Sequence, residues 1–319
     1  MVNTLKNNII EMNGDALRQY IDAKSVFTAL ESASKSAKEV RGGMIWREQN
    51  GTDYLIRTST KAAQKSLGPR SDITEKIYSD FIARKEESQE RIRSLRTEIT
   101  RHQRMNKALR VGRAPDLLVE ILNKLDEVNL SEYFTIIGTY SLYAYEAAAG
   151  VIIKSTEAMT TMDVDLLWDI RKRIGFISQM DNLDTSFLGL LKKVDKTFER
   201  RDGQLYTAVN SKGFEVDIVR RKVESGDPHP VRLTDKDNEL FAVEAERAGL
   251  LLNLPKTSEM IVSVTGRMAR MNTVAPTVFV KIKRWISTID SRHSLKRRRD
   301  LLQAELVDHL LEEYLPQMR

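Results

Sequence analysis

Two short apolar segments of the chain carry acidic side chains at every second position. In TMDVDLLW the acidic residues are Asp163 and Asp165, and in GFEVDIVRR they are Glu215 and Asp217. Because successive side chains of a β-strand point to opposite faces, each acidic pair shares one face, with Cα atoms about 6.6–7 Å apart. Neighbouring carboxylates repel each other and need a cation between them. Hard divalent ions such as Mg²⁺ bind oxygen ligands of this kind.

The chemistry open to these segments depends on whether they lie side by side. As neighbouring strands they would bring three or four carboxylates to one point and could hold a pair of divalent ions. Two such ions, about 3.5–4 Å apart, can activate an attacking hydroxyl and neutralise a leaving pyrophosphate. The alternative for either segment alone is an edge strand with one solvated face.

A glycine turn precedes the first acidic segment. YFTIIG predicts a strand that stops at Gly138, and SLYAYEAAAG predicts a helix that starts near Ser141 and closes at Gly150. A strand, a turn with hydroxyl residues such as Thr139, and a helix N-terminus together aim backbone N–H groups at an anion. Turns of this kind are also common without a ligand.

In chain order, the glycine turn, the Asp-x-Asp pair and a later Asp between apolar residues resemble the motifs of the DNA polymerase beta-like nucleotidyltransferase superfamily. More narrowly, they resemble bacterial nucleotidyltransferase-like proteins related to abortive-infection toxins. The resemblance covers about residues 114–319. It implies that Gly138, Thr139 and Ser141 bind the triphosphate of an NTP, such as ATP.

For the acidic residues the resemblance implies a metal site. Asp163 and Asp165 would bind two Mg²⁺ or Mn²⁺ ions, and Asp217 would complete the site and help to deprotonate the acceptor, with Glu215 as a substitute. Two features depart from the superfamily pattern. Thr139 stands where Ser is frequent but keeps the hydroxyl, and the gap before the Asp pair is long enough to include a loop, KSTEAMTT.

The C-terminal segment PTVFVKIKRWISTIDSRHSLKRRRDLLQAELVDHLL predicts helices, with eight Lys or Arg residues between Lys281 and Arg299. It resembles the lysine-containing helix and following Arg-Asp helix of the same relatives. The resemblance implies that Lys281 or Lys283 contacts the nucleotide phosphates and that Asp300 orients it, with Lys281 as the first choice. Because residues two apart on a helix point about 200° away from each other, only one lysine can face the nucleotide.

The N-terminal part of the chain predicts a hairpin and a long helix. In GGMIWREQNGTDYLIRTS, Asn50 and Gly51 are typical of a tight turn between two strands. Residues 72–109 contain neither Pro nor Gly, which favours one helix of up to roughly 55 Å or a helical hairpin. Ser71 or Asp72 could cap its N-terminus.

The second half of this long helix is strongly basic. From Arg91 to Arg113 there are eight Lys or Arg residues against one acidic residue, Glu98. One interpretation is a solvated helix face. The other is a surface that tracks the phosphates of RNA or DNA and binds the acceptor. The arginines assigned to that surface are Arg93, Arg96, Arg101 and Arg104.

These patterns predict an α+β fold in three parts. Residues 1–113 would form a helical and β-hairpin module with the long basic helix. Residues 114–250 would form a small mixed-sheet nucleotidyltransferase domain, and residues 251–319 a helical C-terminal domain that closes over the nucleotide. The segment VGRAPD, at residues 111–116, would be the joint after the first part, since Gly and Pro interrupt a helix.

Composition excludes several other classes of protein. The 319 residues include no cysteine, which rules out disulfides, thiolate metal sites and a cysteine nucleophile. The four histidines lack metal-ligand spacing, and neither GxxxxGK[ST] nor GxSxG occurs. No segment approaches the roughly 18 apolar residues of a membrane span, so a cytoplasmic protein is expected. The net charge of +6 suggests an anionic partner.

The sequence therefore predicts an enzyme that moves an NMP group from an NTP to an acceptor hydroxyl and releases pyrophosphate. Its acceptor could be tRNA ends or a protein side chain, as in a toxin-like enzyme with a cognate antitoxin as partner. Two alternatives stay open. One is an antibiotic-type transferase that acts on a small molecule, and the other is a catalytically inactive nucleic-acid-binding protein.

Overall fold

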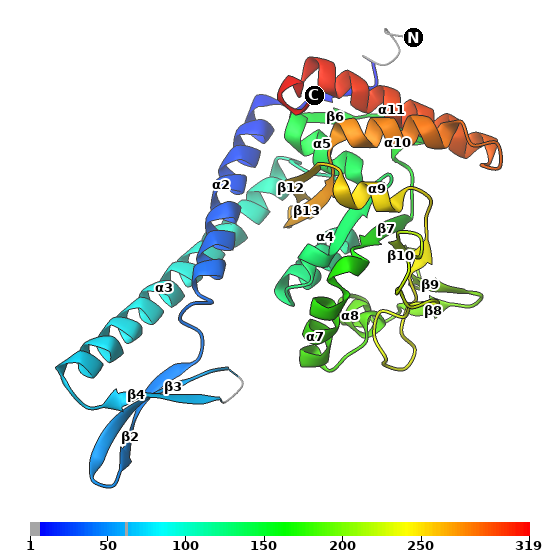
Figure 1. Ribbon diagram of the computed structural model, residues 1–319. Helices are drawn as coiled ribbons and strands as arrows, with labels where there is room; N and C mark the ends of the chain where they lie inside the picture. The colour runs from blue at the N-terminus through cyan, green and yellow to red at the C-terminus, as the bar shows by residue number, and fades with distance from the viewer. Residues whose placement is uncertain (1–6, 61–62) are drawn as a thin grey trace. The chain divides into compact units, whose positions relative to one another are not determined.

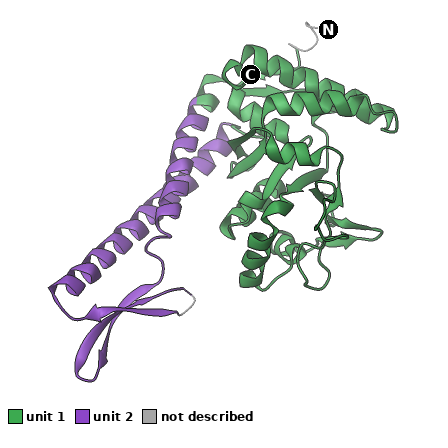
Figure 2. Cartoon of the chain, viewed as in Figure 1, with its two compact units in different colours: residues 1–17, 110–319 green, residues 18–109 purple. Residues whose placement is uncertain are grey.

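The computed structural model describes residues 7–60 and 63–319 (Figure 1). The chain divides into two compact units (Figure 2). Residues up to Leu17 and Arg110–Arg319 form the first unit, and Arg18–Leu109 form the second. None of the described helices is both long enough and apolar enough to cross a membrane.

The second unit combines helices with a three-stranded antiparallel sheet. Its elements are α2 (Gly14–Ser36), which begins in the first unit, β2 (Gly43–Gln49), β3 (Thr52–Thr58), β4 (Gln64–Pro69) and α3 (Asp72–Ala108). The predicted hairpin is confirmed, because Asn50 and Gly51 join β2 to β3 with φ angles of 53° and 74°. Positive φ at both residues matches the twist of the strands that they join.

Helix α3 confirms the prediction of one long helix, since it runs for 37 residues without interruption. Ser71 rather than Asp72 is its N-cap. The Ser71 side chain accepts a hydrogen bond from the Thr74 backbone N–H, and the Thr74 hydroxyl oxygen accepts one from the Ser71 backbone N–H at 2.8 Å. This reciprocal arrangement satisfies two backbone donors that the first helical turn leaves free.

Helices α2 and α3 are joined by a buried polar cluster. The Gln19 amide on α2, only 3% exposed, donates to Asn106 Oδ1 at 2.9 Å and lies 3.0 Å from His102 Nδ1. A buried amide is stable only when it finds partners of this kind. The cluster therefore specifies how the two helices align.

The first unit is built on a mixed eight-stranded sheet, and the predicted α+β fold class is confirmed. The strands lie in the order β12, β13, β5, β7, β10, β9 and β8, with β11 beside β10. Their bounds are β5 (Phe134–Ile137), β7 (Asp163–Trp168), β8 (Glu199–Arg201), β9 (Gln204–Val209), β10 (Glu215–Arg220), β11 (Val243–Glu244), β12 (Lys256–Val262) and β13 (Met268–Val274). Strands β12 and β13 come from the range that the sequence predicted as a helical C-terminal domain.

The helices of this unit surround the sheet and supply the rest of its core (Figure 1). They are α4 (Asp116–Glu127), α5 (Ser141–Ala149), α6 (Thr156–Met159), α7 (Arg173–Leu183), α8 (Phe187–Val194), α9 (Ala248–Asn253), α10 (Pro276–Ser287) and α11 (Ser294–Glu313). Short 3-10 turns occur at Ser131–Tyr133, Ile170–Lys172 and Pro316–Met318, and a separate ladder pairs β1 (Ile9–Glu11) with β6 (Val151–Ile153). Helices α10 and α11 pack together, and α11 also contacts α5 and α6.

Strands β7 and β10 share a burial pattern that explains the acidic alternation in the sequence. Each begins with half-buried acidic residues alternating with a buried valine, and the last three residues of each strand are buried. The far ends of both strands are therefore covered on both faces, as in the interior of an α/β layer. Only their first residues leave one face open for chemistry.

Candidate active site

The two acidic strands lie side by side, which is the arrangement that the sequence needed to bring its carboxylates together. Strands β7 and β10 are parallel neighbours, and their register places Asp165 opposite Asp217 and Asp163 opposite Glu215. Because parallel strands start at the same edge of a sheet, all four acidic residues gather at that edge. Neighbouring strands are about 4.8 Å apart, so their carboxylates face one another across a short gap.

The glycine turn meets this acidic edge. Strand β5 is antiparallel to β7 and places Ile137 opposite Asp165, so Gly138 follows directly beside that carboxylate. Gly138 has a φ of +76°, and a Cβ atom there would lie 2.5 Å from Asp165 Oδ2. Both the backbone conformation and the close approach therefore require glycine.

Burial and neighbouring charge together keep Asp165 protonated at unusually high pH. Burial is the larger cause, and the Asp163 and Asp217 carboxylates add to it, raising the pKa of Asp165 to about 7. The nearby cations of Lys283 and Arg292 act in the opposite direction. Burial also raises the pKa of Asp217 above its ordinary value. Burial and mutual repulsion thus both disfavour the ionised carboxylates of this site.

Two of these carboxylates accept hydrogen bonds from threonine hydroxyl groups. Thr161 Oγ1 donates to Asp163 Oδ1, and Thr207 Oγ1 donates to Asp217 Oδ1 at 2.6 Å. Among residues 7–60 and 63–319, no three acidic or histidine side chains converge closely enough to hold a metal ion as they stand. The aspartates nevertheless offer the oxygen ligands and the negative charge that a hard divalent ion binds.

Glu215, the predicted substitute ligand, is held elsewhere. Its carboxylate forms an ion pair with Arg201 at 2.7 Å. Glu215 is also not among the residues that line the adjoining pocket. Asp163, Asp165 and Asp217 are therefore the acidic residues that the two strands bring to the pocket. Glu246 also lines it, but its side chain is exposed and pairs with Lys222 at 3.3 Å.

A pocket of about 380 Å³ opens onto the three aspartates. One part of its wall is polar. The turn residues Gly138 and Thr139 lie there, and Thr161 and the three aspartates adjoin cationic side chains from α10, α11 and the segment between them. Those cations are Lys283, Arg292, Lys296 and Arg299.

The two candidate lysines on α10 differ sharply in position. Lys283 is 6% exposed and lines the pocket, whereas Lys281 is exposed and lies outside the pocket lining. The Lys283 ammonium donates to Asp300 Oδ1 at 2.7 Å, and Arg292 Nε donates to Asp300 Oδ2 at 2.5 Å. Burial lowers the pKa of Lys283, and the Asp300 carboxylate opposes that effect. Asp300 thus fixes two cations at the pocket wall.

Ser141 lies behind the turn and does not line the pocket. Its side chain is fully buried, and its hydroxyl lies 2.7 Å from Thr273 Oγ1. Thr273 in turn donates to the Ile136 carbonyl at 2.7 Å. Ser141 therefore ties the start of α5 to strands β5 and β13.

Three pocket cations, Arg292, Lys296 and Arg299, were not assigned from the sequence. They belong to the run of basic residues between Lys281 and Arg299, but composition alone does not distinguish them from the other members of that run. A usable signal was present, since Lys296 and Arg299 are three residues apart and share one face of α11. Arg292 precedes the helix, so periodicity would not have found it.

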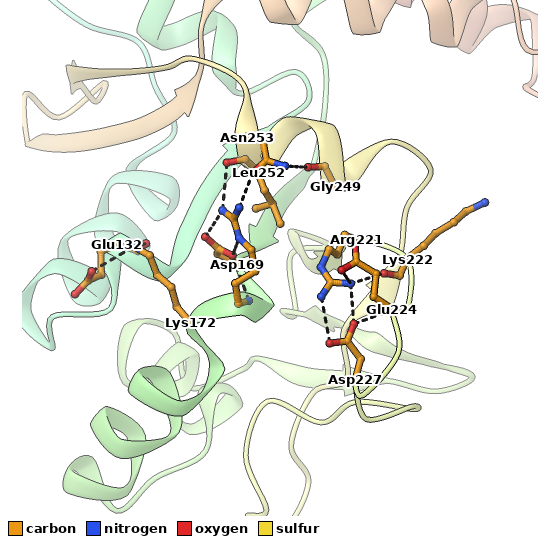
Figure 3. Close-up of polar contacts among 11 residues, drawn as sticks. Glu132, Asp169, Lys172, Arg221, Lys222, Glu224, Asp227, Gly249, Leu252 and Asn253 are labelled. Carbon is orange, nitrogen blue, oxygen red and sulfur yellow. Dashed lines mark hydrogen bonds and ion pairs between the residues drawn. The ribbon is translucent and has the colours of Figure 1, made fainter.

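The rest of the pocket wall is mainly apolar and includes α9 and α10. Val219, Leu251, Phe279 and Ile282 are among its lining residues. Figure 3 shows how the C-terminal end of α9 is anchored, with Leu252 and Asn253 close to Asp169.

One arginine makes that connection. The Arg171 guanidinium pairs with Asp169 at 2.7 Å and donates to Asn253 Oδ1 at 2.5 Å and to the Leu252 carbonyl at 3.3 Å. At the other end of α9, Arg247 stacks 4.0 Å from the centre of the Trp285 ring on α10. Helix α9 is therefore held at both ends.

The four arginines predicted to bind an acceptor all lie on α3, in the second compact unit. Arg93, Arg96, Arg101 and Arg104 are exposed. Arg93 pairs with Glu90 at 2.9 Å and Arg101 with Glu98 at 3.4 Å, contacts that contribute little at a solvated surface. Their charge remains available to an anionic partner.

Replacing Asp165 with Asn should change how stability depends on pH. The folded pKa of about 7 lies above the ordinary 3.8, so the protein without divalent ions should lose free energy of unfolding as pH rises between these values. Asp165→Asn should lose less and unfold at a higher temperature near pH 8, by about 2–4 °C for each kcal/mol regained. Thermal unfolding at about pH 5 and about pH 8 measures this. Asp202→Asn, at an exposed turn, is the control, and equal pH profiles for Asp165→Asn and wild type would contradict the shift.

Comparison with known proteins adds a family assignment to this geometry. Residues 116–318 match the model of a nucleotidyltransferase family, a span that contains the acidic strands, the glycine turn and both C-terminal helices. No curated protein and no solved structure is significantly similar to the chain. Since the matched span covers more than half of the 319 residues, the chain belongs to this nucleotidyltransferase family.

Proposed function

We propose that the chain is a metal-dependent nucleotidyltransferase of the DNA polymerase beta type. It transfers an NMP group from an NTP to an acceptor hydroxyl and releases pyrophosphate. The observation that carries the proposal is one pocket in which three aspartates adjoin buried and half-buried cations. A triphosphate needs the cations, and an attacking hydroxyl needs the carboxylate edge.

The polar part of the pocket suits a triphosphate. Gly138 and Thr139 present a turn directly before α5, where backbone N–H groups favour an anion. Lys283 and Arg292 are preorganised by Asp300, so they would not have to move when phosphate arrives. Fixed charges of this kind stabilise the negative charge that develops on a leaving pyrophosphate.

The acidic edge suits activation of the acceptor. Two Mg²⁺ or Mn²⁺ ions held by Asp163, Asp165 and Asp217 would supply Lewis-acid chemistry at the attacking and leaving oxygens. Asp217, whose pKa is raised, takes the proton of the acceptor hydroxyl. The acceptor oxygen then forms a bond to the α-phosphorus, while the bond from that phosphorus to the pyrophosphate oxygen breaks. Before the metal ions bind, Thr161 and Thr207 donate hydrogen bonds to two of the carboxylates.

For the acceptor we favour RNA, including tRNA ends. The net charge of +6 and the exposed arginines of α3 fit a polyanion. The resemblance to toxin-related proteins makes tRNA ends, other RNA and protein side chains the first acceptors to test, with a cognate antitoxin as a further partner. Incubation with each labelled NTP and Mg²⁺ against total cell RNA and protein identifies where the label goes.

Removing either member of the Asp pair should abolish transfer. Asp163→Ala and Asp165→Ala each take a ligand from the site, and loss of even an outer partner of a metal typically costs about 10–100-fold. We expect a larger loss than that in label transfer, with folding intact because carboxylate repulsion is relieved. Asp202→Ala is the matched control at an exposed turn. Unchanged transfer in both site variants would eliminate the metal-site proposal.

The two lysines of α10 provide a matched pair for the phosphate site. Lys283→Ala should weaken NTP binding by about 10-fold or more, because it removes a charge-assisted hydrogen bond from the pocket. Lys281→Ala removes an equal charge from the exposed face of the same helix and should bind NTP like wild type. Titration calorimetry with NTP and Mg²⁺ separates them. Equal affinities for the two variants would place the phosphate contact elsewhere.

The basic face of α3 is tested by salt dependence. Replacing Arg93, Arg96, Arg101 and Arg104 together with Gln should weaken RNA binding and flatten its dependence on salt, by about 0.7 in the log–log slope for each phosphate that the variant no longer neutralises. NTP binding should stay the same. Filter binding at several salt concentrations gives the slope. A slope equal to that of wild type would mean that this helix face is merely solvated.

A further inference from the structure

One buried amide links the glycine turn to α11. Gln303, in the middle of α11, is fully buried. Its Nε2 atom donates to Thr139 Oγ1 at 3.0 Å and to the Ala158 carbonyl at 2.6 Å. The two acceptors lie on separate segments, one in the turn and the other in α6.

The partners of this amide determine the direction of its hydrogen bonds. A backbone carbonyl only accepts, so the atom next to the Ala158 oxygen must be the nitrogen of the Gln303 amide. The two hydrogens of that nitrogen are then both used. Gln303 Oε1, by contrast, has no hydrogen-bond partner among the described residues.

The direction of the bond constrains Thr139. Because its oxygen accepts from Gln303, the hydroxyl proton of Thr139 must point to a different acceptor. No other side-chain partner of Thr139 occurs in the described part of the chain, and Thr139 lines the pocket beside Gly138. The pocket is therefore where that proton can find an acceptor.

We propose that Gln303 is a positioning residue for NTP binding. Its amide turns the Thr139 hydroxyl so that the proton donates to a phosphate oxygen of the NTP. This inference rests on the proposed nucleotidyltransferase function. It adds a residue that the sequence analysis did not select and that does not itself line the pocket.

The Gln303 amide also holds the segment that contains α6 and precedes the acidic strand β7. Three side chains of α11 bind this segment, since Arg298 pairs with Glu157 at 3.1 Å, Arg299 donates to the Thr160 carbonyl at 3.0 Å, and Gln303 holds Ala158. Thr161, which follows Thr160, donates a hydrogen bond to Asp163. Gln303 thus contacts both segments that lead into the polar part of the pocket.

A double-mutant cycle tests the proposal. Gln303→Met keeps the size but removes both donors, and Thr139→Val keeps the shape but removes the hydroxyl. Each single variant should weaken binding of NTP with Mg²⁺ by about 10-fold, the expected cost of one hydrogen bond to a charged group. The double variant should lose clearly less affinity than the two single losses added together, because Gln303 acts mainly through that hydroxyl. In turnover assays, KM should rise more than kcat falls.

Gln19→Met is the matched control. Gln19 is also a buried glutamine with donor contacts to a side chain and a backbone carbonyl, but it belongs to the second unit. Its replacement should lower the unfolding temperature without changing NTP affinity. If Gln303→Met does not fold, Gln303→Glu replaces it in the cycle. In this buried position the new glutamic acid should stay protonated, donate to the Ala158 carbonyl and accept the Thr139 proton, so NTP binding should weaken at least as much.

The outcomes separate the two levels of the proposal. Wild-type affinity in a folded Gln303 variant, or losses that simply add in the double variant, would overturn the role of Gln303 and leave the nucleotidyltransferase proposal standing. A wild-type protein that binds none of the four NTPs with Mg²⁺ would overturn the proposed function, and this inference with it.

Discussion

The half-buried position of one carboxylate beside like charges is the constraint on which the rest of the site depends. Burial disfavours the ionised form of Asp165, and the neighbouring Asp163 and Asp217 carboxylates add to this effect. The adjacent turn can approach Asp165 only because Gly138 has no Cβ. Such an arrangement lowers the stability of the isolated protein, and sites that bind a cation commonly carry this cost. A divalent ion bound here would offset the repulsion between these carboxylates.

The cations beside these aspartates also need partners, because Lys283 is buried and Arg292 is half-buried. Lys283 and Arg292 share Asp300, which is fully buried and satisfies both. Breaking such a network is costly because it leaves an unpaired charge in the interior. The packing of α10 against α11 is therefore coupled to the geometry of the pocket cations. Gln303, also on α11, extends that coupling to the glycine turn.

The residues proposed for chemistry and those proposed for polyanion binding belong to different units. The aspartates, the turn and the pocket cations all belong to the first unit, whereas the exposed arginines of α3 belong to the second. A long helix with several exposed arginines can present charge to many phosphates, which raises affinity without sequence selectivity. This division fits an enzyme whose acceptor is larger than its nucleotide.

The sequence by itself determined the local features. Alternation marked both acidic strands, Asn50 and Gly51 marked the hairpin, and Gly150 marked the end of α5, because each signal depends on backbone conformation or on period-2 burial. Only the tertiary structure decided that β7 pairs with β10 in register, that Lys283 rather than Lys281 lines the pocket, and that Gln303 reaches Thr139. It also placed β12 and β13, expected within a helical domain, in the central sheet. The physical reason is that a periodic pattern specifies which face of a segment is buried, whereas pairing and helix rotation depend on distant partners.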